Sequence, residues 1–224
     1  MRTLSLVIPV FNAPDLARAA AAAASGLAHV AESCGFSLVE TIFVDDGSVP
    51  PLEVESPGCR VIRVDVNAGK GAAVRRGALE AKGEWVLMSD VDMSAPFTEF
   101  AHLAARADAW MVCGSRHGRR GMPLRRRLLS CLFHLFVWCI GVRGVHDTQC
   151  GFKLFRMDVM RAVFERQRIT RFAFDVELIR RVVVSGGNVA EVPVEWKGGT
   201  RSSLRVLRDA PRMLWDLIRI AAGL

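Results

Sequence analysis

The sequence lacks several features that would place it in a special class of protein. Its longest apolar stretch, residues 128–142, is interrupted by Ser130 and His134 and is shorter than the roughly 18 residues of a membrane-spanning helix. The five histidines show no spacing typical of a metal site, and no internal repeat is present. A strand-like pattern starts at residue 3, so we expect no signal peptide.

Paired cysteine motifs are also missing. Six cysteines are present, none of them in a CxxC pair, and most fall in apolar segments. This distribution favours reduced, buried thiols over a disulfide or zinc framework, and it indicates a cytoplasmic protein.

Positive charge is what the sequence has in excess. The formal net charge is +7 and the isoelectric point is about 9.6, so the partner is expected to be anionic: a nucleotide, a nucleic acid or a lipid head group. With 51% hydrophobic and 24% charged residues, the 224-residue chain is expected to form one globular domain.

Strand-like and helix-like segments alternate along the chain. We expect strands at residues 4–10, 38–44, 60–64, 84–89, 109–114, 149–156 and 188–196. Helices are expected at residues 14–34, 67–81, 96–106, 128–142, 174–184 and 203–224. This alternation predicts an α/β fold with a doubly wound, mostly parallel sheet flanked by helices.

Two acidic residues follow the strand predicted at 84–89. In an extended chain Asp90 and Asp92 would point to the same face, with about 6–7 Å between their Cα atoms. Such a pair could hold one hard divalent cation, Mg²⁺ or Mn²⁺, at the carboxyl end of the strand, where ligands bind in open parallel sheets. The alternative is that both residues only end the strand and cap the next helix.

Five short motifs occur in a characteristic order, at residues 8–12, 44–48, 67–73, 83–84 and 90–92. Together they resemble the family-2 glycosyltransferases, which have the Rossmann-like GT-A fold. Further motifs at residues 114–116, 147–153, 174–178 and 192–196 resemble the dolichyl-phosphate and polyprenyl-phosphate sugar synthases, above all the dolichyl-phosphate β-glucosyltransferases.

The resemblance implies a reaction. A nucleotide-sugar would transfer its sugar to a polyprenyl phosphate at the cytosolic face of a membrane, with inversion at the anomeric carbon. UDP-glucose is the favoured donor, and GDP-mannose is the alternative. A cation held by Asp90 and Asp92 would stabilise the departing diphosphate. The acceptor phosphate is already largely dianionic at neutral pH and needs cationic residues rather than a strong base.

The resemblance also assigns residues to the site. The donor-binding residues would be Pro9, Asn12, Asp45, Asp46, Gly69, Lys70, Asp90 and Val91. The acceptor phosphate would be held by Arg116, Arg126, Ser130, Gln149 and Arg201, and the catalytic set would be Asp92, Asp147, Arg116 and Arg126. Gly69 and Gly71 would allow the backbone to approach the nucleotide closely. The turn-forming tendency of Asp-Gly and Gly-Lys-Gly sequences is the alternative explanation for these motifs.

The chain is expected to divide into a nucleotide-sugar-binding half, residues 1–114, and an acceptor-binding, membrane-contacting half, residues 115–224. The apolar helix at 128–142 and the amphipathic helix at 203–224 would lie in the interface of an anionic membrane, aided by the arginines of residues 116–127. The alternative is that these helices are buried in the core or form a homodimer interface.

Two other functions fit parts of the sequence. A family-2 transferase with a sugar hydroxyl acceptor would need a general base, for which Asp147 is the best candidate. A non-enzymatic, basic lipid- or nucleic-acid-binding module would not need Asp90 or Asp92. The arginine-rich stretch lacks interleaved aromatic residues, so nucleic acid is not expected as a partner.

Overall fold

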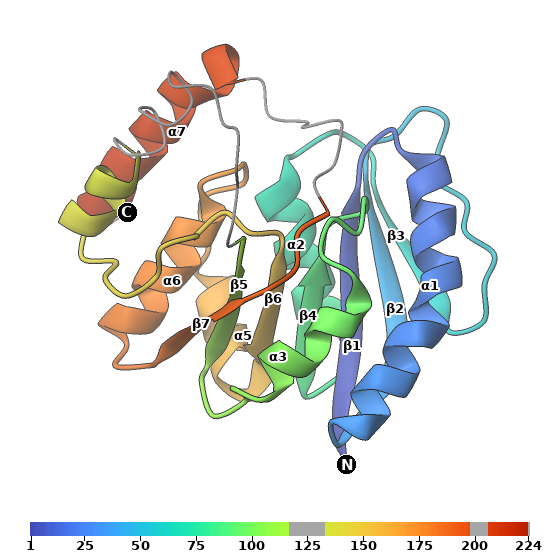
Figure 1. Cartoon of the computed structure of the whole chain (residues 1–224). Coiled ribbons are helices and arrows are strands. Elements are labelled where there is room, and N and C mark those ends of the chain that lie inside the picture. Colours follow the sequence, from blue (N-terminus) through green and yellow to red (C-terminus); the bar gives the residue numbers. More distant parts are fainter. Residues whose placement is uncertain (117–132, 198–205, 224) are drawn as a thin grey trace.

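The computed structural model describes residues 1–116, 133–197 and 206–223, which form a layered α/β structure (Figure 1). Its centre is a seven-stranded sheet with the strand order β3-β2-β1-β4-β6-β5-β7. The strands are β1 (Arg2–Val10), β2 (Phe36–Asp46), β3 (Cys59–Val64), β4 (Trp85–Ser89), β5 (Met111–Ser115), β6 (Phe152–Arg156) and β7 (Val189–Pro193).

The sheet is mostly parallel, as the sequence predicted. β1 pairs in parallel with β2 and β4, β2 with β3, and β5 with β7. β6 is the exception, because it lies between β4 and β5 and runs antiparallel to both. The chain leaves β5 at the carboxyl end of that strand and enters β6 at the same end of the sheet, so β6 runs in the opposite direction.

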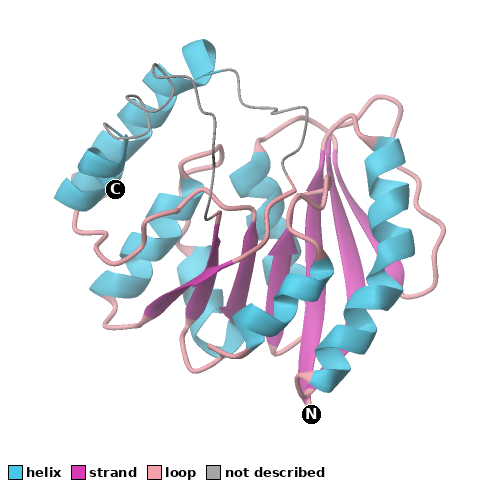
Figure 2. Cartoon of the chain, in the orientation of Figure 1, coloured by secondary structure: helices cyan, strands magenta, loops and turns pink. Residues whose placement is uncertain are grey.

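Helices cover both faces of the sheet (Figure 2). One core cluster joins the sheet to α1 (Pro14–Ser33), the 3₁₀ helix η1 (Phe97–Glu99) and α3 (Phe100–Ala104). The other cluster joins it to α2 (Lys70–Glu80), α5 (Met157–Glu165), α6 (Phe174–Val184) and α7 (Val206–Ala221). The sheet is therefore buried on both faces, as expected for strands that read as continuous apolar runs.

Some predicted elements were wrong in detail. α5 was not predicted, and the helix expected at residues 96–106 is a 3₁₀ turn followed by a short α-helix. Of the apolar helix expected at 128–142, residues 133–139 are helical and a turn follows them, while residues 128–132 lie outside the described chain. No helix among the described residues is long and apolar enough to cross a membrane.

The described cysteines are all free thiols, as predicted, but they are not all buried. Cys113 on β5 and Cys150 before β6 are buried, Cys34 and Cys59 are partly buried, and Cys139 is exposed. The expectation of buried thiols is therefore wrong for Cys139, which follows the exposed residue Trp138 on the helix at 133–139.

The Gly83-Glu84 motif lies at the amino end of β4 and is structural. The Gly83 N–H donates to the hydroxyl of Ser5, and the Glu84 carboxylate accepts the N–H of Thr3 at 2.8 Å. A Cβ atom at Gly83 would lie 2.6 Å from the backbone nitrogen of Ser5, so only glycine fits there. This motif aligns β4 with β1 and so fixes where β4 ends.

Candidate functional site

The two acids after β4 lie in a turn. The N–H of Met93 donates to the carbonyl of Asp90 at 3.0 Å, and the N–H of Ser94 donates to Oδ1 of Asp92 at 3.1 Å. Met93 has a positive φ of 47°, which closes this turn. The predicted extended geometry of Asp90 and Asp92 is therefore wrong, because the strand ends at Ser89. Their assignment as metal ligands remains a prediction.

The Asp90 side chain is held between α2 and the start of β6. Its Oδ1 lies 2.5 Å from Nζ of Lys70, and the two side chains are 28% and 23% exposed. The backbone N–H of Asp90 donates to the carbonyl of Gly151 at 3.0 Å. A Cβ at Gly151 would lie 1.9 Å from Asp90 Oδ2, so the absence of a side chain there leaves room for the carboxylate.

A buried ion pair lies close to this carboxylate. Nζ of Lys153 is 2.8 Å from Oδ1 of Asp175, with the two side chains 0% and 4% exposed, and it also donates to the carbonyl of Cys150. Burial raises the pKa of Asp175, while Lys153 and Lys70 act against this rise. Burial alone would lower the pKa of Lys153, but the negative charge of Asp175 and the nearby Cys113 and Cys150 together raise that pKa. Both residues fall in the motifs at 147–153 and 174–178, but no role was predicted for either of them.

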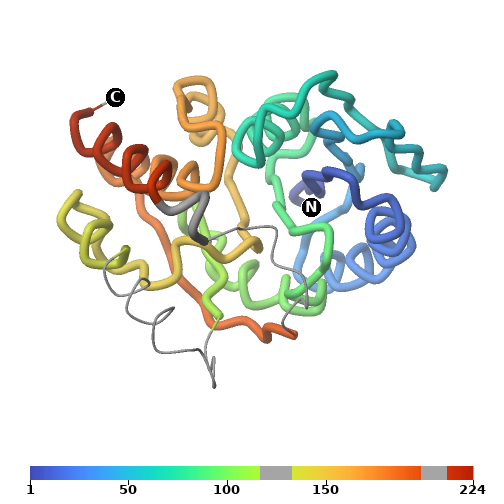
Figure 3. The backbone as a smooth tube through the Cα atoms, turned by 90° about the horizontal axis from the view of Figure 1, so that it is seen from above, coloured from blue at the N-terminus to red at the C-terminus, as the bar shows by residue number. Residues whose placement is uncertain are grey.

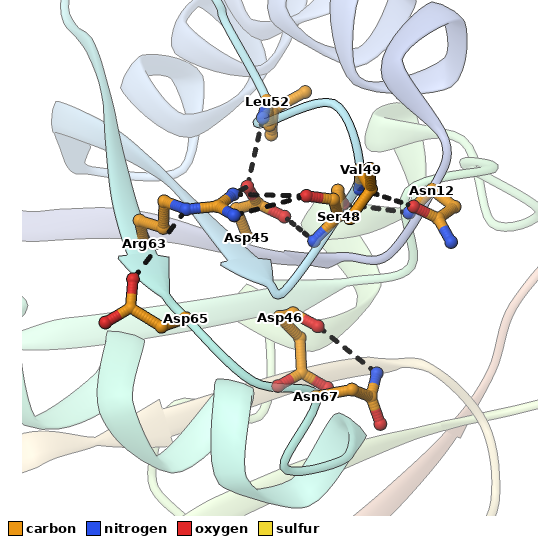
Figure 4. A network of polar contacts seen from close by, with 9 residues as sticks. All are labelled: Asn12, Asp45, Asp46, Ser48, Val49, Leu52, Arg63, Asp65 and Asn67. Atoms are coloured by element: carbon orange, nitrogen blue, oxygen red, sulfur yellow. Dashed lines mark hydrogen bonds and ion pairs between the residues drawn. The ribbon is translucent and has the colours of Figure 1, made fainter.

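Asp45 orders the loop that follows β2 (Figure 4). Its fully buried carboxylate accepts the N–H groups of Ser48 and Leu52 at 2.9 and 3.0 Å and pairs with Nη1 of Arg63 at 2.5 Å. Burial alone would raise the pKa of Asp45, but these hydrogen bonds and Arg63 hold it below its usual value. Asn12, which has a positive φ of 50°, is tied to the same loop, because its Oδ1 accepts the N–H of Val49 at 2.9 Å.

Asp46 orders the glycine-rich turn before α2. Its two carboxylate oxygens accept the N–H groups of Ala68 and Gly69, each at 2.8 Å. The sequence analysis expected Asp45 or Asp46 to contact the nucleotide. In this arrangement both carboxylates are buried and accept backbone N–H groups of the loops after β2 and before α2, while a contact with the nucleotide stays a prediction.

The glycines of that turn are needed for packing. Gly69 has a φ of 109°, and a Cβ there would lie 2.6 Å from the carbonyl oxygen of Thr170. A Cβ at Gly71 would lie 2.6 Å from Cβ of Phe174. The sequence predicted that the backbone at Gly69 and Gly71 approaches a nucleotide closely. In the structure, residues 169–174 of the protein lie against these two glycines.

Glu177 supports that segment from α6. Its buried carboxylate accepts the N–H groups of Arg168 and Ile169 and pairs with Nε of Arg181 at 2.8 Å. Gln167 adds a hydrogen bond from its Nε2 to the carbonyl of Gly71 at 2.9 Å. The sequence analysis assigned no site role to either residue, and the structure shows that both order the base of the glycine turn.

Arg116 and Asp147 form a two-bonded ion pair beyond the carboxyl end of β5. Nε and Nη2 of Arg116 donate to Oδ2 and Oδ1 of Asp147, both at 2.6 Å, and the backbone N–H of Arg116 also donates to Oδ2. The side chains are only 15% and 18% exposed. Burial alone would raise the pKa of Asp147, but Arg116 outweighs it and holds the pKa of this carboxyl below its usual value.

Two further residues fix this pair in place. Glu191 on β7 accepts the backbone N–H groups of His146 and Asp147 at 2.9 and 2.7 Å. The guanidinium of Arg116 lies over the ring of Trp196, 5.2 Å from its centre. Glu191 and Trp196 had no assigned role in the sequence, because their contacts with residues 116–147 arise only in the folded sheet.

Gln149 is partly buried in the segment before β6. Its Nε2 is buried and has no hydrogen-bond partner among the described residues, and the same holds for the hydroxyls of Ser94 and Thr148. Pro9 and Val91 are partly exposed at the ends of β1 and β4. Three predicted acceptor-binding residues lie outside the described parts of the chain: Arg126, Ser130 and Arg201.

The described residues suit a cation that is shared with a substrate. They contain no group of three or more His, Cys, Asp or Glu side chains able to hold a metal ion. Asp90 and Asp92 supply the oxygen ligands that Mg²⁺ and Mn²⁺ prefer, and too few of them for a closed protein cage. Such a cation would keep open positions for phosphate oxygens and water.

Comparison with known proteins identifies the family. The family model described as "Glycosyl transferase family 2" matches residues 5–164, which include the loops of Asp45, Asp90 and Asp147. The chain belongs to glycosyl transferase family 2. The match crosses the expected boundary at residue 114, and residues 167–174 of the second half contact the glycine turn of the first.

Several similar proteins are named dolichyl-phosphate β-glucosyltransferase. The protein from Dictyostelium discoideum is 34% identical over 202 residues, covering 81% of this chain and 62% of its own length. One from Trichomonas vaginalis is 36% identical, covering 81% and 59%, and the human protein is 34% identical, covering 70% and 55%. The chain thus spans about three fifths of the length of the first two relatives.

Solved structures confirm the expected GT-A fold of this family-2 chain. Mannosyl-3-phosphoglycerate synthase from Rubrobacter xylanophilus superimposes with a TM-score of 0.70 at 20% identity, covering 99% of this chain and 73% of its own. Glucosyl-3-phosphoglycerate synthase from Mycobacterium tuberculosis, in complex with Mn²⁺, UDP and glucosyl-3-phosphoglycerate, has a TM-score of 0.70 at 19% identity, covering 100% and 81%.

Proposed function

We propose that this chain transfers a sugar, with inversion, from a nucleotide-sugar to the phosphate of a polyprenyl phosphate such as dolichyl phosphate. UDP-glucose is the proposed donor, because relatives at 34–36% identity are named as dolichyl-phosphate glucosyltransferases. GDP-mannose is the second candidate donor.

The single observation that carries the proposal is the state of Asp147. A sugar hydroxyl acceptor needs a general base, and the carboxylate expected to supply it is engaged on both oxygens by Arg116 and has a lowered pKa. A carboxylate stabilised in this way is a weak base. A phosphate acceptor has a second pKa of about 6 and attacks without a base, so it fits the site better.

Arg116 then has a direct role in binding the acceptor. Asp147 and Trp196 hold its guanidinium in one orientation, and a guanidinium has five N–H donors, of which this pair uses two. The unused donors can bind a phosphate oxygen. Gln149, with its unpartnered Nε2, would supply a neutral donor beside it. Arg126, Ser130 and Arg201 remain further candidates from the sequence.

Asp90 and Asp92 would bind Mg²⁺ or Mn²⁺ together with the donor diphosphate. When bound, the cation neutralises the charge that develops on the leaving diphosphate. Structures of the same fold have been obtained with Mn²⁺ and UDP, which supports a divalent cation here. Lys70, in the first turn of α2, would add positive charge at a helix N-terminus, where phosphates bind well.

The surface near α7 supports attachment to a membrane. Six large apolar side chains of two adjacent helices are each 41–61% exposed: Leu135, Phe136, Trp138, Leu214, Trp215 and Ile218. The two helices lie side by side (Figure 3). Arg180 joins them, because it donates to the carbonyls of Ile140 and Ala221 at 3.0 and 3.4 Å. We propose that this surface rests in the interface on the cytosolic face, where a polyprenyl chain can reach the site.

The test is a transfer assay with purified protein, polyprenyl phosphate and a panel of nucleotide-sugars. We expect a sugar-phosphate lipid to form from UDP-glucose, and formation to stop with a chelator or with Asp92→Asn. Asp158→Asn is a matched control, because Asp158 is 67% exposed and pairs with Arg156 away from the site. Product formed only on a sugar hydroxyl, or equal activity in the presence of chelator, would refute the proposal. If product forms only from GDP-mannose, the proposed donor changes to GDP-mannose and the proposed acceptor stays the same.

A further inference from the structure

The contact between Lys70 and Asp90 raises a question about how the metal site fills. Nζ of Lys70 lies 2.5 Å from Oδ1 of Asp90, with both side chains about three quarters buried. An ammonium group and a divalent cation compete for the same carboxylate oxygens. In this arrangement the lysine occupies one of the two oxygens that Asp90 offers.

The fold places Lys70 in an electrostatically unfavourable position. It is the first residue of α2, and the first turn of this helix contains no acidic residue. Positive charge at a helix N-terminus is disfavoured by the helix dipole, so Asp90 is the group that stabilises Lys70 there. The backbone at this point is fixed, because Gly69 is hydrogen-bonded to Asp46 and packs on Thr170. The flexible lysine side chain is thus the part that can move.

The surrounding charges oppose a cation that arrives alone. Lys153 lies buried nearby, and Asp175, which feels the charge of both Lys70 and Asp90, is already paired with it. Since Asp175 already balances Lys153, a divalent ion would have to approach Asp90 against the ammonium group of Lys70. A diphosphate changes this balance, because it offers Lys70 a new anionic partner at the helix N-terminus.

We propose that Lys70 blocks Asp90 until a nucleoside diphosphate group arrives, and that the diphosphate draws the lysine away and opens Asp90 to the divalent cation. Cation and nucleotide therefore bind as one unit, and each strengthens the binding of the other. This inference rests on the proposed donor class, and it adds a positioning role for Lys70 in metal entry.

The experiment measures Mn²⁺ binding by electron paramagnetic resonance, with and without UDP and without any acceptor. For the wild type we expect weak Mn²⁺ binding alone and much tighter binding with UDP. In Lys70→Gln we expect Mn²⁺ alone to bind about ten-fold more tightly, a factor that corresponds to about 1.4 kcal/mol. The enhancement by UDP should fall by about the same factor, because Mn²⁺ affinity rises only without UDP; with UDP bound, the lysine of the wild type has already left Asp90.

Two variants serve as controls. Lys70→Arg keeps a positive charge beside Asp90, so its Mn²⁺ affinity without UDP should stay close to that of the wild type. Lys82→Gln removes the same charge from an exposed residue at the other end of β4, and it should change nothing. If Lys70→Gln unfolds, Lys70→Arg still tests the idea, because a large gain in its Mn²⁺ affinity would show that positive charge does not block the site.

Unchanged or weaker Mn²⁺ binding by folded Lys70→Gln would overturn the inference and leave the proposed transfer reaction intact. If the wild type binds no Mn²⁺ even with UDP, the inference and the metal-dependent part of the proposed function both fail. The transfer assay with polyprenyl phosphate separates these outcomes, because it reports on the reaction and not on the order of binding.

Discussion

Replacing Asp147 by asparagine separates the two chemical roles that a carboxylate at this position could have. As a general base, Asp147 would contribute about 10²–10⁴ to the rate. As the partner of Arg116, it only orients the guanidinium through two 2.6 Å bonds. Asparagine keeps one acceptor oxygen, so Asp147→Asn would lose one charge-assisted bond, about 2 kcal/mol and about 30-fold in acceptor use.

The pH profile decides between these roles more sharply than the size of the effect. The pKa of Asp147 lies below its usual value, and asparagine does not titrate. If Asp147 orients Arg116, the acidic limb of kcat/KM is set by the second ionisation of the acceptor phosphate, near pH 6, and survives in Asp147→Asn. The loss should appear mainly in KM for the polyprenyl phosphate.

Steady-state kinetics between pH 5 and 8 with a fixed nucleotide-sugar would provide the measurement. Arg116→Lys is the companion variant, because it keeps the charge and loses the two-bonded geometry. Its effect should not add to that of Asp147→Asn in the double variant, since both disrupt one unit. Loss of the acidic limb in Asp147→Asn, with KM unchanged, would refute the positioning role and restore Asp147 as a base.

Three other predictions follow from described contacts. Asp45→Asn should lower the free energy of unfolding at pH 7 by about 2–3 kcal/mol, below the value for fully buried pairs because Arg63 is 35% exposed. The folded pKa of Asp45 is depressed, so its contribution to stability is present above the unfolded pKa of 3.8 and is lost as the pH falls through the folded pKa. In denaturant unfolding, the free energies of unfolding of wild type and Asp45→Asn should therefore converge at acidic pH. A difference that stays constant with pH would contradict this prediction. Gly151→Ala should turn the Asp90 carboxylate away, since the new Cβ would lie 1.9 Å from its Oδ2. The Mn²⁺ affinity measured with UDP should then fall, while the melting temperature changes little. An unchanged Mn²⁺ affinity would show that Asp90 is not a metal ligand. Trp138→Asp should weaken binding to anionic vesicles about ten-fold or more in a sedimentation assay, because the exposed ring could no longer enter the membrane interface. Equal vesicle binding by the variant and the wild type would show that the surface around Trp138 does not contact the membrane.

The positions of most strands and helices along the chain could be predicted from the sequence, because local patterns determine them. The apolar run at residues 85–89 and the acids that follow it mark the end of a buried strand, and β4 ends there. α6 has the predicted bounds, Phe174–Val184. These features depend on residues that are neighbours in the sequence.

Features that depend on distant residues could not be predicted. β6 runs antiparallel to β4 and β5, and no local pattern in the sequence encodes this direction. The ion pairs Arg116–Asp147 and Lys153–Asp175 join residues 31 and 22 positions apart in the sequence. The sequence alone therefore did not show that these charges neutralise each other. The turn at Asp90 was missed because a positive φ at Met93 is unusual for that residue type.

The packing of residues 169–174 on Gly69 and Gly71 has a consequence for protein engineering. The family model stops at residue 164, so a chimaera with its junction there would combine a donor loop from one parent with a supporting segment from another. Thr170 and Phe174 approach the two glycines so closely that a bulkier or displaced segment would shift the start of α2. Exchange of acceptor specificity between relatives should therefore keep residues 165–177 from the donor parent, even though they lie outside the recognised family boundary.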